Sequence, residues 1–230
     1  MQNWISFIPV GTTVLSLLFF IEMWLHYSVR KKMYLLWWTI GVATFGLGTF
    51  TESYNALFGF QESNFRMWYI VGALLGGFPL AQGSVYLHMS KPFSKWSSVL
   101  FVALILVGAC CAIISPIHLG HDFDGRLSGK IFEWQWVRYF SPLINLYSFV
   151  FLVGGALYSA IKYFKQKETK AYFVGNLMIA VGGLLPGIGG SFTRMGYVEV
   201  LFVTEFIGLC LIYFGYKLIK RVNRERLMTN

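Results

Sequence analysis

Residues 17 to 32 of the chain are "LLFFIEMWLHYSVRKK". An apolar run that ends in a cluster of three basic residues is typical of the cytoplasmic end of a membrane-spanning helix. Extended back to Ile5, the segment has the roughly 20 residues that crossing a bilayer requires. It nevertheless carries Glu22 and, one helical turn later, His26. The stretch therefore predicts a membrane protein and draws attention to the polar side chains within its spans.

The composition of the whole chain agrees with this prediction. Of its 230 residues, 56% are hydrophobic and 13% are charged, whereas soluble chains carry about 25% charged residues. Seven segments are long and apolar enough to span a bilayer, and their predicted bounds are 5–27, 33–50, 67–89, 96–117, 139–161, 171–190 and 198–216. The sequence predicts an all-α integral membrane protein, in which residues 1–230 form a single seven-helix transmembrane domain in contact with the lipid bilayer.

The loops between the predicted spans alternate in charge. Most lysines and arginines fall after the first, third and fifth spans and in the C-terminal tail. The positive-inside rule then places the N-terminus outside and the C-terminus in the cytoplasm. Compact loops favour the inner cell membrane of a bacterium. The net charge of +9 is thus interpreted as a topology signal with affinity for anionic lipid, and no nucleic-acid partner is expected.

A weak internal repeat relates the first three spans to the last three. The second predicted span ends in "GLGTFTE" and the sixth in "GIGGSFTR". A three-plus-one-plus-three duplication is one interpretation, and chance recurrence of Gly, Phe and Thr in such biased helices is the other. Parallel repeats are common in transporters, but a receptor or a subunit can share the arrangement.

Polar residues within the spans fall at two depths. The layer toward the predicted outer side supplies the candidate ligand-binding residues, which are Glu52, Asn145, Ser148, Arg194 and Glu205. The second layer lies toward the predicted cytoplasmic side and contains Glu22, His26, Gln82, His88 and Asn176. Tight packing of helices around small and polar side chains is the alternative explanation for both layers.

Three acidic residues carry the sharper expectations. Glu205 lies about eight residues from the outer end of its span with no basic neighbour on its own helix, so we expect it to line a cavity. Glu22 can pair with His26 or with the basic cluster at residues 30–32. Glu52 and Arg194 lie at the outer ends of two spans, where they could form an ion pair that closes the outer mouth. The alternative is that both side chains extend to water.

Several chemistries are disfavoured by the sequence. Two histidines lie near each predicted side of the membrane, which argues against a three-histidine hydrolase within the bilayer. The last span has no lysine between Val198 and Tyr216, which excludes a retinal Schiff base there. The loop after the fourth span offers His118, His121 and Asp122 as weak metal-ligand candidates, with a solvated loop as the alternative. A haem held between the two inner histidines is a further minor hypothesis, and we expect no cofactor.

The sequence favours a protein that binds a small molecule or lipid within its helix bundle, as a transporter or permease. The alternative is a non-catalytic sensor or an accessory subunit of a larger membrane complex, with membrane-protein partners or a homo-oligomer. An enzyme is the least favoured class, because no phosphate-binding glycine loop and no nucleophile elbow is present. A polar cavity between the first three and the last three spans would favour transport.

Overall fold

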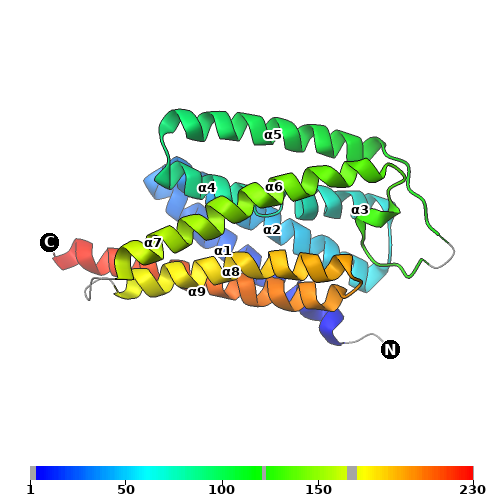
Figure 1. The fold of residues 1–230 in the computed structure, drawn as a ribbon. Helices are drawn as coiled ribbons and strands as arrows, with labels where there is room; N and C mark the ends of the chain where they lie inside the picture. Colours follow the sequence, from blue (N-terminus) through cyan, green and yellow to red (C-terminus); the bar gives the residue numbers. More distant parts are fainter. Residues whose placement is uncertain (1–3, 121–122, 165–169, 230) are drawn as a thin grey trace.

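The structure is a computed structural model that describes residues 4–120, 123–164 and 170–229. It is 87% helical, and the described residues contain no β-strand. Seven spans are long and apolar enough to cross a membrane, which confirms the predicted fold class. The chain is a multipass membrane protein. Its two ends lie at opposite ends of the bundle (Figure 1), and these are called the N-terminal end and the C-terminal end below.

Five of the spans are single helices and two are interrupted. The single helices are α1 (Ile8–Arg30), α2 (Met33–Phe58), α5 (Lys91–Ile114), α8 (Lys170–Arg194) and α9 (Val198–Thr229). The third span consists of α3 (Glu62–Trp68), the π-helical segment η2 (Tyr69–Leu75) and α4 (Phe78–His88). The fifth consists of α6 (Phe140–Ser148), the π-helical segment η5 (Phe149–Val153) and α7 (Gly154–Phe164). Short 3-10 helices at Trp4–Phe7, Gly129–Ile131 and Gln135–Tyr139 flank the spans.

Two helices continue well beyond the predicted spans. Helix α2 reaches Phe58 instead of ending near residue 50, and it stops where Gly59 adopts a positive φ of 77°. Helix α9 continues from the apolar segment into a polar extension that ends at Thr229, where Arg221 and Glu225 form an ion pair one turn apart. The residues of both extensions remain compatible with a helix although they are no longer apolar. The length of the apolar run therefore underestimates the length of each helix.

The first three and the last three spans form two neighbouring groups. Helix α1 packs along α2, and α4 packs against α2; in the other group α8 packs along α9, and α7 packs against α8. The groups meet where α1 contacts α9 and where α4 contacts η5. Helix α5 lies at one edge of the bundle beside α4 and α6 (Figure 1). This arrangement fits three-plus-one-plus-three connectivity, whereas the internal duplication stays a prediction.

Glycine allows α8 and α9 to approach each other backbone to backbone. A Cβ atom at Gly182 would lie 2.6 Å from the carbonyl oxygen of Gly208, and one at Gly215 would lie 2.6 Å from that of Gly175. A Cβ at Gly189 would lie 2.8 Å from the Cα of Leu201. Gly175, Gly182 and Gly189 are seven residues apart, so they share one helix face. Close packing of this kind holds helices together in lipid.

The long connection between α5 and α6 covers the N-terminal end of the first group. Ile117 and Phe132 form an isolated antiparallel bridge, and Phe132 is buried against Phe65 and Tyr69. Leu127 of the same connection is also buried. The described part of this connection is therefore packed onto the N-terminal end of the bundle.

Candidate functional site

Glu52 is buried within the bundle near the N-terminal end. It lies six residues before the end of α2, about 9 Å along the helix, and it is 5% exposed. Its Oε1 accepts a hydrogen bond from the indole Nε1 of Trp68 at 3.1 Å. Trp68 is the last residue of α3, and the tight turn between α2 and α3 brings it back over α2.

Glu205 reaches Glu52 from the other group of helices. It lies seven residues after the start of α9, about 10 Å along that helix, so both acids are at nearly the same depth. Their carboxyl groups lie close enough to interact directly with each other. A hydrogen bond between two carboxyl groups needs a proton on one of them. The pair therefore joins α2 to α9 and holds two acids at a depth where an unpaired charge is expensive.

A cavity of about 140 Å³ lies beside Glu52, between the two groups of helices. The polar and aromatic residues that line it are Glu52, Asn55, Trp68, Arg126, Thr193, Glu199 and Phe202. They come from α2, α3, the connection between α5 and α6, α8 and α9. The cavity thus lies where elements distant in sequence converge, as most ligand sites do.

Three buried oxygen atoms in this region lack a hydrogen-bond donor among the described residues. They are Oε2 of Glu52, Oδ1 of Asn55 and Oε2 of Glu205. The amide nitrogen of Asn55 already donates to the carbonyl oxygen of Gly125 at 3.2 Å, which fixes the direction of Oδ1. Leaving a buried polar atom unpaired costs about 1–3 kcal/mol. Native structures rarely keep such atoms without a use for them.

Arg126 lies at the mouth of the cavity. Its guanidinium donates to the carbonyl oxygen of Gly196 at 2.7 Å, pairs with Asp124 at 3.1 Å and approaches Glu199 at 3.9 Å. The side chain is 48% exposed, so these contacts are weak and open to solvent. Arg126 links the connection between α5 and α6 to the turn between α8 and α9.

The structure brings together only part of the predicted outer layer. Glu52 and Glu205 meet, as described above. Asn145 and Ser148 lie elsewhere, at the break between η2 and α4: a Cβ at Gly76 would lie 3.1 Å from Oδ1 of Asn145, and one at Gly77 3.3 Å from Cβ of Ser148. The side chain of Arg194 lies outside the described residues, so its predicted ion pair with Glu52 stays a prediction.

The residues of the predicted inner layer do not form one site. Oε1 of Glu22 lies 2.9 Å from Nζ of Lys220, and Oε2 lies 3.4 Å from Nζ of Lys217 and accepts a hydrogen bond from Tyr213 at 3.2 Å. The cations that Glu22 meets therefore come from α9 and not from its own helix. Nδ1 of His26 is 2.8 Å from the hydroxyl of Tyr216.

The other three residues of this layer make separate contacts. Gln82 is fully buried; it donates to the carbonyl oxygen of Ser94 and accepts from the hydroxyl of Tyr147 at 2.6 Å. Nε2 of His88 is 2.9 Å from the hydroxyl of Ser159 on α7. Asn176 donates to a carbonyl oxygen of its own helix. The contacts of Gln82 and His88 join different spans, whereas the contact of Asn176 stays within α8.

The predicted metal ligands are only partly within the described residues. His118 belongs to them, whereas His121 and Asp122 lie outside. In the described part of the chain, no group of three His, Cys, Asp or Glu side chains lies close enough to hold a metal ion. His26 and His88 face different partners, on α9 and α7.

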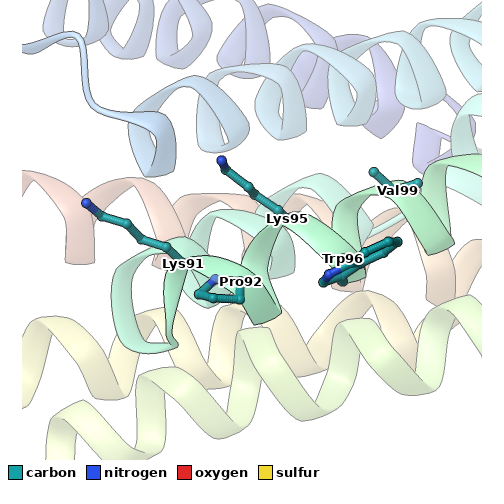
Figure 2. Close-up of a pocket in the computed structure, with 5 residues that line it drawn as sticks. All are labelled: Lys91, Pro92, Lys95, Trp96 and Val99. Atoms are coloured by element: carbon teal, nitrogen blue, oxygen red, sulfur yellow. The ribbon is translucent and has the colours of Figure 1, made fainter.

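A larger hollow of about 450 Å³ lies at the start of α5. Figure 2 shows that its labelled residues, Lys91, Pro92, Lys95, Trp96 and Val99, all come from this one helix. None of them carries a buried polar atom that lacks a partner. Lysine and tryptophan at the end of a span are typical of the bilayer interface. The smaller cavity beside Glu52 is therefore the stronger candidate site.

Four residues of the site were missing from the candidates drawn from the sequence. Asn55 is one turn beyond Glu52, and ending the predicted span near residue 50 hid it. Trp68 is aromatic and therefore belongs to neither predicted polar layer. Arg126 and Glu199 were outside the predicted polar layers, and only the packing of the connection brings them to the cavity.

Comparison with known proteins adds no relative: no protein-family model, no curated protein and no solved structure matches the chain.

Proposed function

We propose that the protein binds a small molecule in the cavity beside Glu52 and carries it across the membrane. The observation that supports this is the buried carboxyl pair of Glu52 and Glu205, which joins the two groups of helices while Glu52 also lines the cavity. Ionisable groups at such depth are rare in membrane proteins and commonly mark transport pathways. Sites between two groups of spans are also where transporters bind substrates.

The two ends of the bundle differ in a way that supports the proposal. At the C-terminal end, polar contacts join the same two groups: Glu22 to Lys220, His26 to Tyr216 and His88 to Ser159. At the N-terminal end, the cavity lies between them behind the exposed contacts of Arg126. A transporter needs a state in which the site opens toward one side and is closed toward the other. The same proposal includes the predicted orientation, in which the N-terminal end and its cavity face the outer side of a bacterial inner membrane.

The proposal can be tested without knowing the ligand. Thr193 lines the cavity, so a cysteine there, in a chain whose own cysteines are replaced, should react with a membrane-impermeant thiol reagent. Combining Glu22→Gln with Lys220→Met removes the closest ion pair that joins α1 to α9 at the C-terminal end. We expect this to shift the population toward a state closed at the N-terminal end and to slow the reaction about threefold, which corresponds to about 0.7 kcal/mol.

A cysteine at Ser63 is the matched control, because Ser63 is exposed at the same end and lies outside the cavity. Its reaction rate should not change in the double variant. If the double variant also leaves the reaction rate at Thr193→Cys unchanged, the two ends of the bundle are not coupled. That result would contradict transport and would favour the accessory-subunit alternative.

A further inference from the structure

The cavity beside Glu52 presents hydrogen-bond acceptors to any occupant. Oε2 of Glu52 and Oδ1 of Asn55 are buried, belong to residues that line the cavity and lack a donor among the described residues. Glu205 adjoins Glu52 but is not one of the residues that line the cavity. An occupant that satisfies Oε2 of Glu52 and Oδ1 of Asn55 has to donate hydrogen bonds. A purely accepting ligand, such as a carboxylate or a phosphate, would leave them unpaired.

The charges around the cavity select a cation. Glu52 and Glu199 line it, Glu205 adjoins Glu52, and Asp124 lies beside the mouth. Arg126 is the cation among the described lining residues, and it is already engaged by Asp124, Glu199 and the carbonyl oxygen of Gly196. Even with one proton shared between Glu52 and Glu205, the described side chains here carry more negative than positive charge. A positive occupant would offset that excess.

Two further properties narrow the class of cation. Trp68 and Phe202 contribute aromatic walls, and aromatic faces attract organic cations. The volume of about 140 Å³ is well below the roughly 300–1,000 Å³ of sites that hold drug-sized ligands. A small cation therefore fits such a space better than a bulky multi-ring cation.

We infer that the cavity binds a small organic cation that carries N–H donors, of the ammonium or guanidinium class. This inference rests on the proposed function and names the kind of substrate. Its N–H groups donate to Glu52 and Asn55, and its charge lies against the carboxyl pair. A quaternary ammonium ion has the same charge but no N–H group, so it meets the electrostatic condition and fails the hydrogen-bonding one.

Radiolabelled guanidinium at millimolar concentration provides the test, with purified full-length protein in mild detergent and a scintillation proximity readout. We expect saturable binding that unlabelled methylammonium displaces and tetramethylammonium displaces at least tenfold less well. Glu52→Gln should raise the Kd for guanidinium about tenfold or more, because hydrogen bonds to charged groups contribute most. Asn55→Leu should raise it as well, and it serves as the second variant should Glu52→Gln lose its monodisperse elution.

Glu62→Gln is the matched control, since Glu62 is an exposed carboxylate at the same end that pairs with Arg66. It removes the same charge outside the cavity and should leave the Kd unchanged. Equal displacement by tetramethylammonium, or an equal loss of affinity in Glu62→Gln, would overturn the inference. Absence of guanidinium binding would also overturn it. If guanidinium does not bind but the labelling rate at Thr193→Cys still changes in the double variant, only the inference about the ligand is wrong. If the labelling rate does not change either, the proposed transport function is wrong as well.

Discussion

The close contact between α8 and α9 makes one quantitative prediction. Gly182 on α8 and Gly208 on α9 face each other: a Cβ at Gly182 would be 2.6 Å from the oxygen of Gly208, and one at Gly208 would be 2.7 Å from the oxygen of Gly182. Both contacts are with backbone, so no side-chain rotation can relieve them. Gly182→Ala therefore has to push the helices apart.

The size of the effect follows from these distances. Ordinary van der Waals contact begins near 3.4 Å, so α9 has to move away by about 0.8 Å at this level. Overpacking of this kind typically costs about 1–3 kcal/mol. Replacing glycine by alanine inside a helix returns up to about 1 kcal/mol through backbone entropy. We expect Gly182→Ala to lower the free energy of unfolding by up to about 2 kcal/mol, and to be about 1–3 kcal/mol less stable than an alanine placed where no atom is crowded.

The measurement is an unfolding titration with sodium dodecyl sulfate from mild detergent, followed by tryptophan fluorescence. Gly187→Ala is the control, because it lies on the same helix and no described atom lies within 4 Å of a Cβ placed there. It should be neutral or slightly stabilising. Equal stability of Gly182→Ala and Gly187→Ala would refute the backbone contact and, with it, the placement of α9 that brings Glu205 to Glu52.

Three further predictions concern the two ends of the bundle. In a chain free of its own cysteines, Ser63→Cys should react with an impermeant thiol reagent on intact cells and Ser90→Cys, at the other end of the same span, should not; the reverse pattern would contradict the predicted orientation. A double-mutant cycle of Glu22→Gln and Lys220→Met should give a coupling energy of about 0–1 kcal/mol, since the lysine side chain is 40% exposed, and a coupling of several kcal/mol would show that the pair is buried in the membrane. Arg126→Gln should speed labelling of a cysteine in the cavity about twofold or more because the weak contacts at the mouth are lost, and slower labelling would show that Arg126 holds the cavity open.

Hydropathy predicted the spans well and their ends less well. Each predicted span corresponds to a helix or an interrupted helix that crosses the bundle. The apolar window tracks the thickness of the bilayer, however, whereas a helix ends where backbone hydrogen bonding stops. Helix α2 therefore continues to Gly59 and α9 to Thr229. The interruption at Gly76, where φ is +39°, also leaves hydropathy unchanged.

The glycines of α8 illustrate a second limit. The sixth predicted span carries two glycine stripes at helical spacing, one with Gly183, Gly187 and Gly190 and the other with Gly175, Gly182 and Gly189. In the structure, Gly175, Gly182 and Gly189 face α9 at backbone contact distance. At Gly187 and Gly190, in contrast, no described atom lies within 4 Å of a Cβ. Both stripes have valid helical periodicity, so only the placement of the neighbouring helix decides between them.

The candidate site shows the same division between what depth predicts and what contacts decide. Counting residues along each span placed Glu52 and Glu205 at a common depth, and they do meet. The predicted ion pair of Glu52 with Arg194, or the extension of both side chains to water, stays a prediction because the Arg194 side chain is not among the described ones. The described contacts of Glu52 are an indole N–H and a second acid. Two acids can share this position if a proton bridges them or if a cation in the adjoining cavity offsets their charge. A packed interior with no shared proton and no cavity would not accommodate both carboxyl groups, so the pair and the cavity are best explained together.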